Sequence, residues 1–136
     1  MSKEYLNPAA LFPSQQYGFS QLVTSPAGKL VFLSGQVGWD AEQTMVGKGD
    51  LRAQTWQALR NVEAAMQAAG GGLNDVVSLR IYIVAERLAE SQHIQAALQT
   101  FFPAERAPAA TWIGVPALAN EAFLVEIEAT AVIDDD

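Results

Sequence analysis

The sequence predicts an α+β fold in which a single mixed β-sheet is covered on one face by two helices. Two observations predict it. The 136 residues are 50% hydrophobic, enough for the core of one compact domain over residues 1–136. Two segments with the apolar spacing of helices alternate with segments patterned like strands. The expected order is therefore strand, strand, helix, strand, helix, strand, strand.

The N-terminal part predicts an irregular arm followed by a β-hairpin. Residues 1–12 contain Pro8 and show no periodic pattern. Residues 21–23 predict a short strand, and the turn sequence Pro-Ala-Gly-Lys at 26–29 joins it to a second strand at 30–33. The glycines that continue the second strand, in Ser-Gly-Gln-Val-Gly, indicate a bulge or a close approach to the backbone.

Two helices are expected. Asp50 can cap a helix that runs to residue 69, and the three glycines 70–72 end it. The second helix covers residues 87–102 and stops at Pro103. Each has an apolar stripe. The first stripe is Leu51, Leu59, Val62, Met66 and Ala69, and the second is Leu88, Ile94, Leu98 and Phe101.

The clearest strand is residues 76–84, and two further strands are expected at 109–115 and 123–133. Alternation along 76–84 divides the side chains between two faces. One face carries Val77, Leu79, Ile81 and Ile83, and the other carries Ser78, Arg80 and Tyr82.

With both helices on one face, the other face of the sheet has no cover within the chain. This open face is expected to hold Arg80, Tyr82, Glu126, Glu128, Thr130, Leu124 and Val132. Its apolar members need burial, and packing between subunits is the simplest source. We therefore predict a homo-oligomer.

Composition excludes several classes of function. The formal net charge is −7 with only 8 basic residues, which disfavours a nucleic-acid binder. There is no cysteine, and one histidine without an acidic cluster predicts no metal site. No apolar run approaches the ~18–20 residues of a membrane helix. No leader pattern is present at the N-terminus, so we expect a cytoplasmic protein without a membrane partner.

The residues that could carry chemistry are few. Glu126 and Glu128 share a strand face and could divide acid and base roles, or could be solvated or paired with Arg80 or Arg87. With His93 the only histidine, a Ser–His–Asp triad is not expected.

For two further residues and the lone histidine, a purely structural role is weighed against a role in binding or catalysis. Ser34 is expected to be structural or to hydrogen-bond a ligand. Trp112 fits a core or interface position better than a ligand stacker. His93, in a polar part of a helix, is expected at the surface.

Several stretches together resemble the Rid family, also called the YjgF family, of reactive-intermediate (enamine and imine) deaminases. They are FSQLV, LVFLSGQVGWD, ALRNVEAAMQAAGGGLNDVVSLRIYIV, FFPAERAPAATWIGV and LVEIEATAV, and they span about residues 19–132. The resemblance implies a chorismate-mutase-like fold and a homotrimer with a sheet-lined central barrel and a ligand cleft at each subunit boundary. It also implies hydrolysis of imines or enamines to a keto acid and ammonia, with no cofactor or metal.

The sequence departs from the family pattern at the residues that hold the substrate. An arginine that binds the substrate carboxylate in a Pro-Ala-Arg-Ser/Thr motif falls on Ala110. The family tyrosine falls on Phe19 and the family asparagine on Gln95. Arg106 lies four residues before Ala110, ~13 Å along an extended strand, so it cannot fill the same position.

Other family positions are kept. The serine of the Ser-Gly-Gln motif is Ser34, and the glutamate proposed to handle the water or proton is Glu126. Thr111 stands at the Ser/Thr position, and Trp112 shares a strand face with Ala110 and is expected to enter the same cleft. The resulting pocket is more apolar than the family pattern.

Two functions follow as alternatives. In the first, Glu126 activates water to hydrolyse a small neutral or aromatic imine or enamine, which Ser34, Thr111 and backbone amides near Val115 orient. In the second, the trimer binds a small metabolite without catalysis. Ribonuclease activity, sometimes attached to this family, is disfavoured by the acidic balance.

Overall fold

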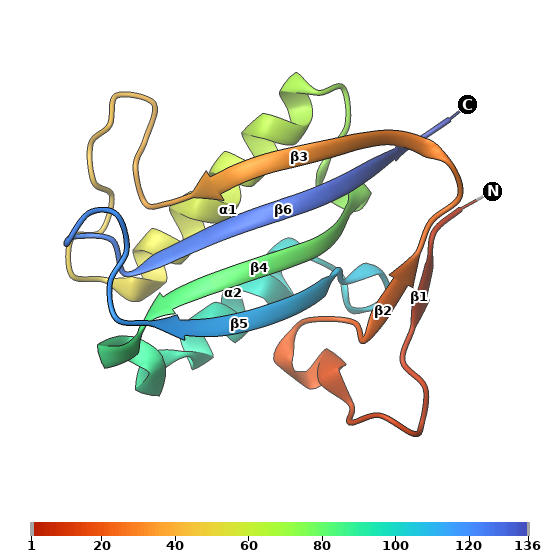
Figure 1. Cartoon of the computed structure of the whole chain (residues 1–136), viewed down its shortest axis with the longest axis horizontal. Coiled ribbons are helices and arrows are strands. Elements are labelled where there is room, and N and C mark those ends of the chain that lie inside the picture. Colours follow the sequence, from red (N-terminus) through yellow and green to blue (C-terminus); the bar gives the residue numbers. More distant parts are fainter. Residues whose placement is uncertain (1, 136) are drawn as a thin grey trace.

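The computed structural model describes residues 2–135 and consists mainly of one four-stranded sheet (Figure 1). Its strands are β3 (Gly28–Gln36), β4 (Val76–Val84), β5 (Ala109–Val115) and β6 (Val125–Asp134). They lie in the order β3-β6-β4-β5. β6 is antiparallel to both β3 and β4, whereas β5 is parallel to β4. The predicted mixed sheet is confirmed.

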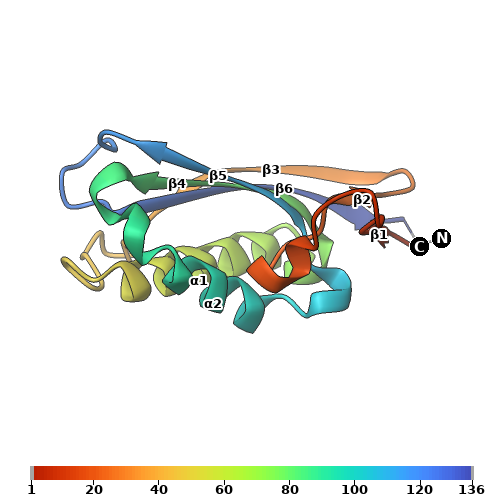
Figure 2. The same cartoon turned by 90° about the horizontal axis from the view of Figure 1, so that it is seen from below.

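Helices α1 (Leu51–Ala68) and α2 (Gln92–Phe101) both pack on one face of this sheet, as predicted (Figure 2). Asp50 caps α1, its Oδ1 accepting a hydrogen bond from the Ala53 amide at 3.1 Å. The core lies between the helices and the sheet. Its fully buried members include Leu59, Val62, Met66, Leu79, Ile81, Ile83, Ile94, Leu98 and Ile127.

The predicted N-terminal hairpin is wrong. β2 (Leu22–Thr24) pairs with β1 (Glu4–Leu6) in a separate two-stranded sheet, whereas β3 pairs with β6. The strand β1 also lies in the arm that we expected to be irregular. Three residues are too few for a visible alternation. The predicted turn at 26–29 is only a bend at Ala27, because Gly28 and Lys29 already belong to β3, and the chain passes there from the small sheet to the large one (Figure 1).

No hairpin forms at the C-terminal end either. β5 reaches its place beside β4 through α2, which makes a β-α-β unit with parallel strands. The loop after β5 then carries the chain back to the middle of the sheet, where β6 lies between β3 and β4. Strand order depends on these long-range pairings, which local sequence patterns do not encode.

Some element boundaries also differ from prediction. The segment before α2 is a separate 3-10 helix, Ala85–Glu90. In β4, the pairing with β6 shifts between Val76 and Ser78, so Val76 is buried in the core and Val77 is only partly buried. Leu124 was expected on the open face, but it precedes β6 and belongs to the core, where its amide donates to buried Gln54 Oε1 at 2.9 Å.

The other face of the sheet is uncovered within the chain, as predicted (Figure 2). On β3, Leu30 and Phe32 are 60% and 75% exposed. They stand beside Val132 and Thr130 of β6. In the described part of the chain, no helix is long and apolar enough to span a bilayer.

Candidate functional site

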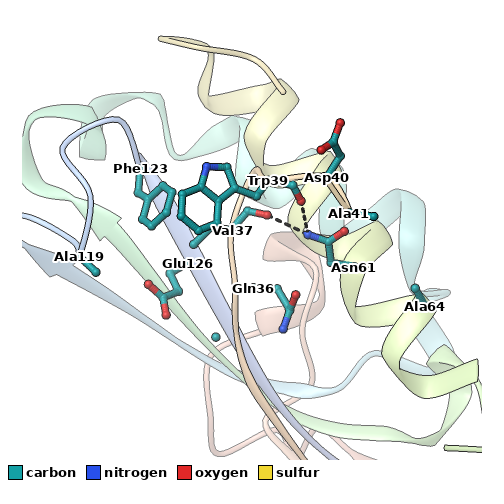
Figure 3. Close-up of a pocket in the computed structure, with 11 residues that line it drawn as sticks. Gln36, Val37, Trp39, Asp40, Ala41, Asn61, Ala64, Ala119, Phe123 and Glu126 are labelled. Carbon is teal, nitrogen blue, oxygen red and sulfur yellow. Dashed lines mark hydrogen bonds between the residues drawn. The ribbon is translucent and has the colours of Figure 1, made fainter. Parts of the chain in front are cut away.

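Glu126 lies at the wall of a cavity of about 490 Å³ between the ends of β3 and β6 and the side of α1 (Figure 3). Its carboxylate is half-buried and has no hydrogen bond or ion pair with any described residue. The cavity is lined by Gly35, Gln36, Val37, Trp39, Asp40, Ala41, Asn61, Ala64, Ala119, Phe123 and Glu126. A carboxylate with free oxygens at such a wall is available to a water or a ligand.

A bulge in β3 brings the backbone close to Glu126. The pairing of β3 with β6 is regular to Leu33 and resumes only at Gln36. Between them, the backbone of Gly35 lies so near the Glu126 carboxylate that a Cβ on residue 35 would overlap its Oε2 atom. Ser34, in the same bulge, is exposed, and its carbonyl accepts from Gln36 Nε2 at 3.1 Å. A side chain at position 35 would therefore displace the Glu126 carboxylate from its present position.

Two aromatic rings form the apolar wall of the cavity. Trp39 and Phe123 meet edge to face, with ring centroids 4.7 Å apart and an interplanar angle of 80° (Figure 3). Asn61 of α1 fixes the segment that carries Trp39. Its Nδ2 donates to the carbonyls of Val37 and Trp39 at 3.0 and 2.9 Å.

A second hollow of about 290 Å³ adjoins Glu126 on the open face of the sheet. Gly35, Tyr82, Leu118, Glu126 and Glu128 line it, so Gly35 and Glu126 border both hollows. The Tyr82 hydroxyl donates a hydrogen bond to Glu128 Oε1. This hydrogen bond raises the pKa of Tyr82 above 10.0; burial and the Glu128 charge act in the same direction, and Arg80 opposes them. Glu128 is thus engaged, whereas Glu126 is free.

Neither hollow beside Glu126 has a lysine or arginine among the described residues that line it. Asp40 adds a further carboxylate to the larger one, although its Oδ1 is occupied by the amides of Glu42 and Thr44, each at 2.9 Å. In Figure 3 the Asp40 carboxylate points away from Glu126. The surroundings of Glu126 are therefore apolar and negative.

The residues at the other predicted site positions gather at the opposite edge of the sheet, on β5. Phe19 packs on Trp112, with ring centroids 6.2 Å apart. Ala110 and Trp112 pair with Leu79 and Ile81 of β4, so they share the helix-covered face of the sheet. Gln95 lies nearby on α2, because a Cβ on Gly18, next to Phe19, would stand 3.3 Å from the Gln95 carbonyl oxygen.

This β5-edge cluster, Phe19, Gln95, Ala110 and Trp112, has two polar side-chain groups, the Gln95 amide and the Trp112 indole N–H. Trp112 Nε1 is buried and has no hydrogen-bond partner among the described residues. A buried donor without an acceptor is costly, so an acceptor from a ligand or another subunit would stabilise it.

Within one chain the two groups of predicted residues do not meet. Glu126 and Ser34 lie on β6 and β3, whereas the β5-edge cluster lies beyond β4. Thr111 is exposed on the open face, opposite Arg80 in the register. Arg106 is also remote from Glu126. It borders a small hollow beside Lys3, Tyr5 and Asp134.

Three residues around Glu126 were not predicted: Trp39, Asn61 and Phe123. Trp39 and Phe123 lie in or next to irregular segments, where side-chain direction cannot be derived from alternation. Asn61 interrupts the apolar pattern of α1 next to its buried stripe. A polar amide at such a position was the one available signal, and it indicates a hydrogen bond to a neighbouring segment.

Several known proteins are similar to this chain in fold and in sequence. The family model described as Endoribonuclease L-PSP matches residues 10–133. A crystal structure of YyfB from Yersinia pestis, a protein of unknown function in the conserved Rid family, superposes with a TM-score of 0.92 at 39% identity, covering 98% of this chain and 100% of the other.

Two curated relatives have a named activity. The 2-iminobutanoate/2-iminopropanoate deaminase of Dermatophagoides farinae is 31% identical over 98% of this chain and 100% of its own length. The protein of the same name from Salmonella typhimurium is 33% identical over 77% of this chain and 80% of its own. From the family model and these similarities, the chain belongs to the Rid (YjgF, L-PSP) family.

Proposed function

We propose that this protein is an imine or enamine deaminase in which Glu126 is the general base. The observation that carries the proposal is the free carboxylate of Glu126 at the wall of the 490 Å³ cavity. The similarity to two imine deaminases supports it.

The proposed reaction adds water to a C=N bond. Glu126 takes a proton from the water as its oxygen attacks the imine carbon, and the π electrons move to nitrogen. The proton then passes to nitrogen, which gives a carbinolamine. Glu126 next takes the hydroxyl proton and delivers it to nitrogen as the C–N bond breaks, and a carbonyl compound and ammonia leave. One carboxylate can serve as base and then as acid when it stays in reach of both atoms.

We further propose that the complete site forms between subunits of a homotrimer. The exposed Leu30 and Phe32 on the uncovered sheet face need a partner, and a second copy would supply one. A neighbouring β5-edge cluster placed against the Glu126 cavity would close it and give the Trp112 N–H an acceptor.

The test compares two adjacent carboxylates on one strand. Imines are generated in situ, and their hydrolysis is followed as ammonia release or as loss of semicarbazide trapping. Glu126→Gln is expected to lower the rate by about 10²–10⁴-fold, the range for general acid–base catalysis. Glu128→Gln removes the same charge on the same face two residues away but leaves the Glu126 carboxylate in place, so it separates loss of charge from loss of the base and is expected to lower the rate far less. Equal rates for wild type and Glu126→Gln would reject the role of Glu126.

A non-catalytic trimer that binds a small metabolite is the second candidate. The favouring observation is that Phe19 and Ala110 carry no polar side-chain group where the family pattern has a tyrosine and an arginine. Calorimetric binding of aromatic and keto compounds, without turnover of any imine, would support it.

A further inference from the structure

We propose that the substrate is the iminium ion of a primary amine with an aromatic or branched apolar side chain and no carboxylate. This inference rests on the proposed deaminase function. It follows from the charges around Glu126, from the β5 edge and from the aromatic wall of the cavity.

The charges beside Glu126 favour a cation. The two hollows share the carboxylate of Glu126, the smaller one is also lined by Glu128, and neither is lined by a lysine or arginine from the described part of the chain. A substrate carboxylate there would meet like charge, and the partly enclosed setting strengthens the repulsion. A protonated C=N group is positive and is attracted by the same carboxylates. The electrostatics select for the cation and against the anion.

The basic residues of the chain are placed elsewhere. Lys3 bonds Asp134 at 2.7 Å, Lys29 donates to the Ala69 carbonyl at 2.7 Å, and Arg87 pairs with Glu90 at 3.3 Å. Arg52 and Arg60 lie over the Trp56 ring on α1, at 5.3 and 5.8 Å from its centroid.

The remaining three line neither hollow. Arg80 is the nearest of them: it lies on the open face beside Ser78, Glu128 and Thr130, next to the smaller hollow, where it offsets part of the charge of Glu128 but does not reach the larger cavity. Arg106 borders the hollow at the N-terminal strand, and Lys48 is exposed in a loop before α1.

The β5 edge does not supply a cation either. Ala110 ends at a methyl group, and its neighbours in the cluster are the rings of Phe19 and Trp112. If this edge closes the cavity in the trimer, it adds apolar surface, the Trp112 N–H and the neutral amide of Gln95. None of these can replace the two parallel hydrogen bonds and the charge of a guanidinium.

The cavity also suits a flat apolar group. Trp39 and Phe123 present an edge-to-face pair next to Glu126, and a volume of about 490 Å³ lies within the range of small-molecule sites. Aromatic faces attract cations as well as rings, so the wall favours an aryl iminium on both counts.

The chemistry then fixes what must come before and after. A primary amine, R–CH₂–NH₂, loses two electrons and two protons to a flavin-type oxidant and becomes R–CH=NH, which is protonated to R–CH=NH₂⁺. Water adds to its carbon as Glu126 takes one of the water protons and passes it to nitrogen. The C–N bond then breaks, and the hydroxyl proton is transferred to the departing ammonia. The products are the aldehyde R–CHO and NH₄⁺. The supplying reaction is thus the oxidation of an amine, and an aldehyde-consuming step follows.

The experiment uses two imines that differ only in the carboxylate. A flavin amine oxidase acting on 2-phenylethylamine releases the imine of phenylacetaldehyde. A flavin amino-acid oxidase acting on phenylalanine releases the same imine with a carboxylate at its carbon. Each is trapped with semicarbazide, and the full-length protein is added over a concentration series. We expect kcat/KM to be at least about 10-fold higher for the imine without the carboxylate, because the carboxylates beside Glu126 repel a negatively charged substrate.

The two proposals fail in different ways. Equal or faster hydrolysis of the phenylalanine-derived imine overturns the substrate inference and leaves the deaminase proposal standing. If the protein accelerates the hydrolysis of none of these imines, and not that of the imine formed from 2-aminobutyrate either, then both the deaminase proposal and the substrate inference are overturned.

A variant tests the aromatic wall in the same assay. Trp39→Leu keeps an apolar side chain and is expected to lower the preference for the phenylethylamine imine over a propylamine imine. An unchanged preference would overturn the aromatic part of the inference.

Discussion

The Glu126 cavity keeps the residues that the family resemblance implies, whereas the β5-edge cluster departs from them. Around Glu126, the Ser-Gly-Gln motif and the glutamate are both present, and β3 forms a bulge at the motif. On β5, an alanine and a phenylalanine stand where the pattern has an arginine and a tyrosine, and a tryptophan lies beside them. The side that would react with water is retained, and the side that would hold the substrate is altered.

This difference separates chemistry from recognition. A base needs only a carboxylate near the reacting carbon, whatever the rest of the substrate carries. A bidentate arginine, by contrast, is useful only for a carboxylate or a similar anion. A protein that keeps the base and lacks the arginine is what a change of substrate within one type of reaction would produce. A loss of activity altogether would not need Gly35 and Glu126 to stay in close contact.

The largest effect is expected for Gly35→Ala, which tests whether the retained side is functional. The added Cβ overlaps Glu126 Oε2 and would push the carboxylate out of the cavity wall. We expect imine hydrolysis to fall by about 10²-fold or more, as for other catalytic groups displaced by an ångström. The measurement is kcat/KM on the preferred imine.

Gly72→Ala is a matched control, because nothing lies within 4 Å of a Cβ placed there. Activity of Gly35→Ala equal to that of Gly72→Ala would show that the position of the Glu126 carboxylate does not matter.

Ala110→Arg tests the altered side. If a neighbouring β5 edge closes the cavity, the new guanidinium would pair with a substrate carboxylate, an interaction of about 2–5 kcal/mol when both partners are buried. The ratio of kcat/KM for the phenylalanine-derived imine to that for the phenylethylamine imine should rise by about 30-fold or more.

Ala110→Gln is the control for side-chain size without charge. A ratio that stays the same in Ala110→Arg would mean that this position does not face the substrate.

The helices, β4 and β5 could be predicted from the sequence because their signals are local. Asp50 and the glycines after α1 mark its ends, and alternation marks residues 76–84 and 109–115, which are the observed strand bounds. The uncovered face of the sheet followed from two helices lying on one side. Strand order did not follow, since β6 enters between β3 and β4 through pairings over about 40 to 105 residues.

The candidate site was predictable only in part. Glu126 and Ser34 could be named from motifs in the chain, but Trp39 and Phe123 could not, because they are brought together by Asn61 and by the loop before β6. Leu124 was misplaced for the same reason. Its amide is held by Gln54, 70 residues earlier, and a contact at that separation leaves no local pattern.

The two sides also differ in how their buried polar groups are satisfied, which predicts a difference in stability. Gln54 is fully buried beside the Glu126 cavity. Its Nε2 donates to the carbonyls of Gly47 and Ala122, each at 3.1 Å, and its Oε1 accepts from Leu124. At the β5 edge, Trp112 Nε1 has no partner among the described residues.

We therefore expect Gln54→Leu to lower the free energy of unfolding by about 1–3 kcal/mol, because it strands three backbone groups. Trp112→Phe removes a donor that has no acceptor in the described part of the chain, so its effect should be smaller. Urea unfolding of both variants at equal protein concentration is the measurement. A larger loss for Trp112→Phe would locate the acceptor of its N–H in another subunit.

The smallest expected effect is a change in stability at high pH. It comes from the hydrogen bond between Tyr82 and Glu128, whereas Glu126 has no such partner among the described residues. The pKa of Tyr82 is raised above 10.0, chiefly by this hydrogen bond, so the folded state holds the phenolic proton more tightly than the unfolded chain. By linkage, the stabilisation is fully present below about pH 10 and is lost as the pH rises through the raised pKa. Thermal melting of wild type and Tyr82→Phe from pH 8 to 12 should show a small difference that narrows at the alkaline end.

Tyr5 must be separated from this effect, because burial also raises its pKa and it titrates in the same range. Tyr5→Phe is therefore melted in parallel, and the double variant is compared with both. If Glu128 is the engaged carboxylate, adding Glu128→Gln to wild type and to Tyr82→Phe should remove the alkaline difference between them, whereas adding Glu126→Gln should leave it. The reverse pattern would mean that Tyr82 donates its hydrogen bond to Glu126. The proposed base would then have a hydrogen-bond partner, which contradicts the free carboxylate on which the mechanism depends.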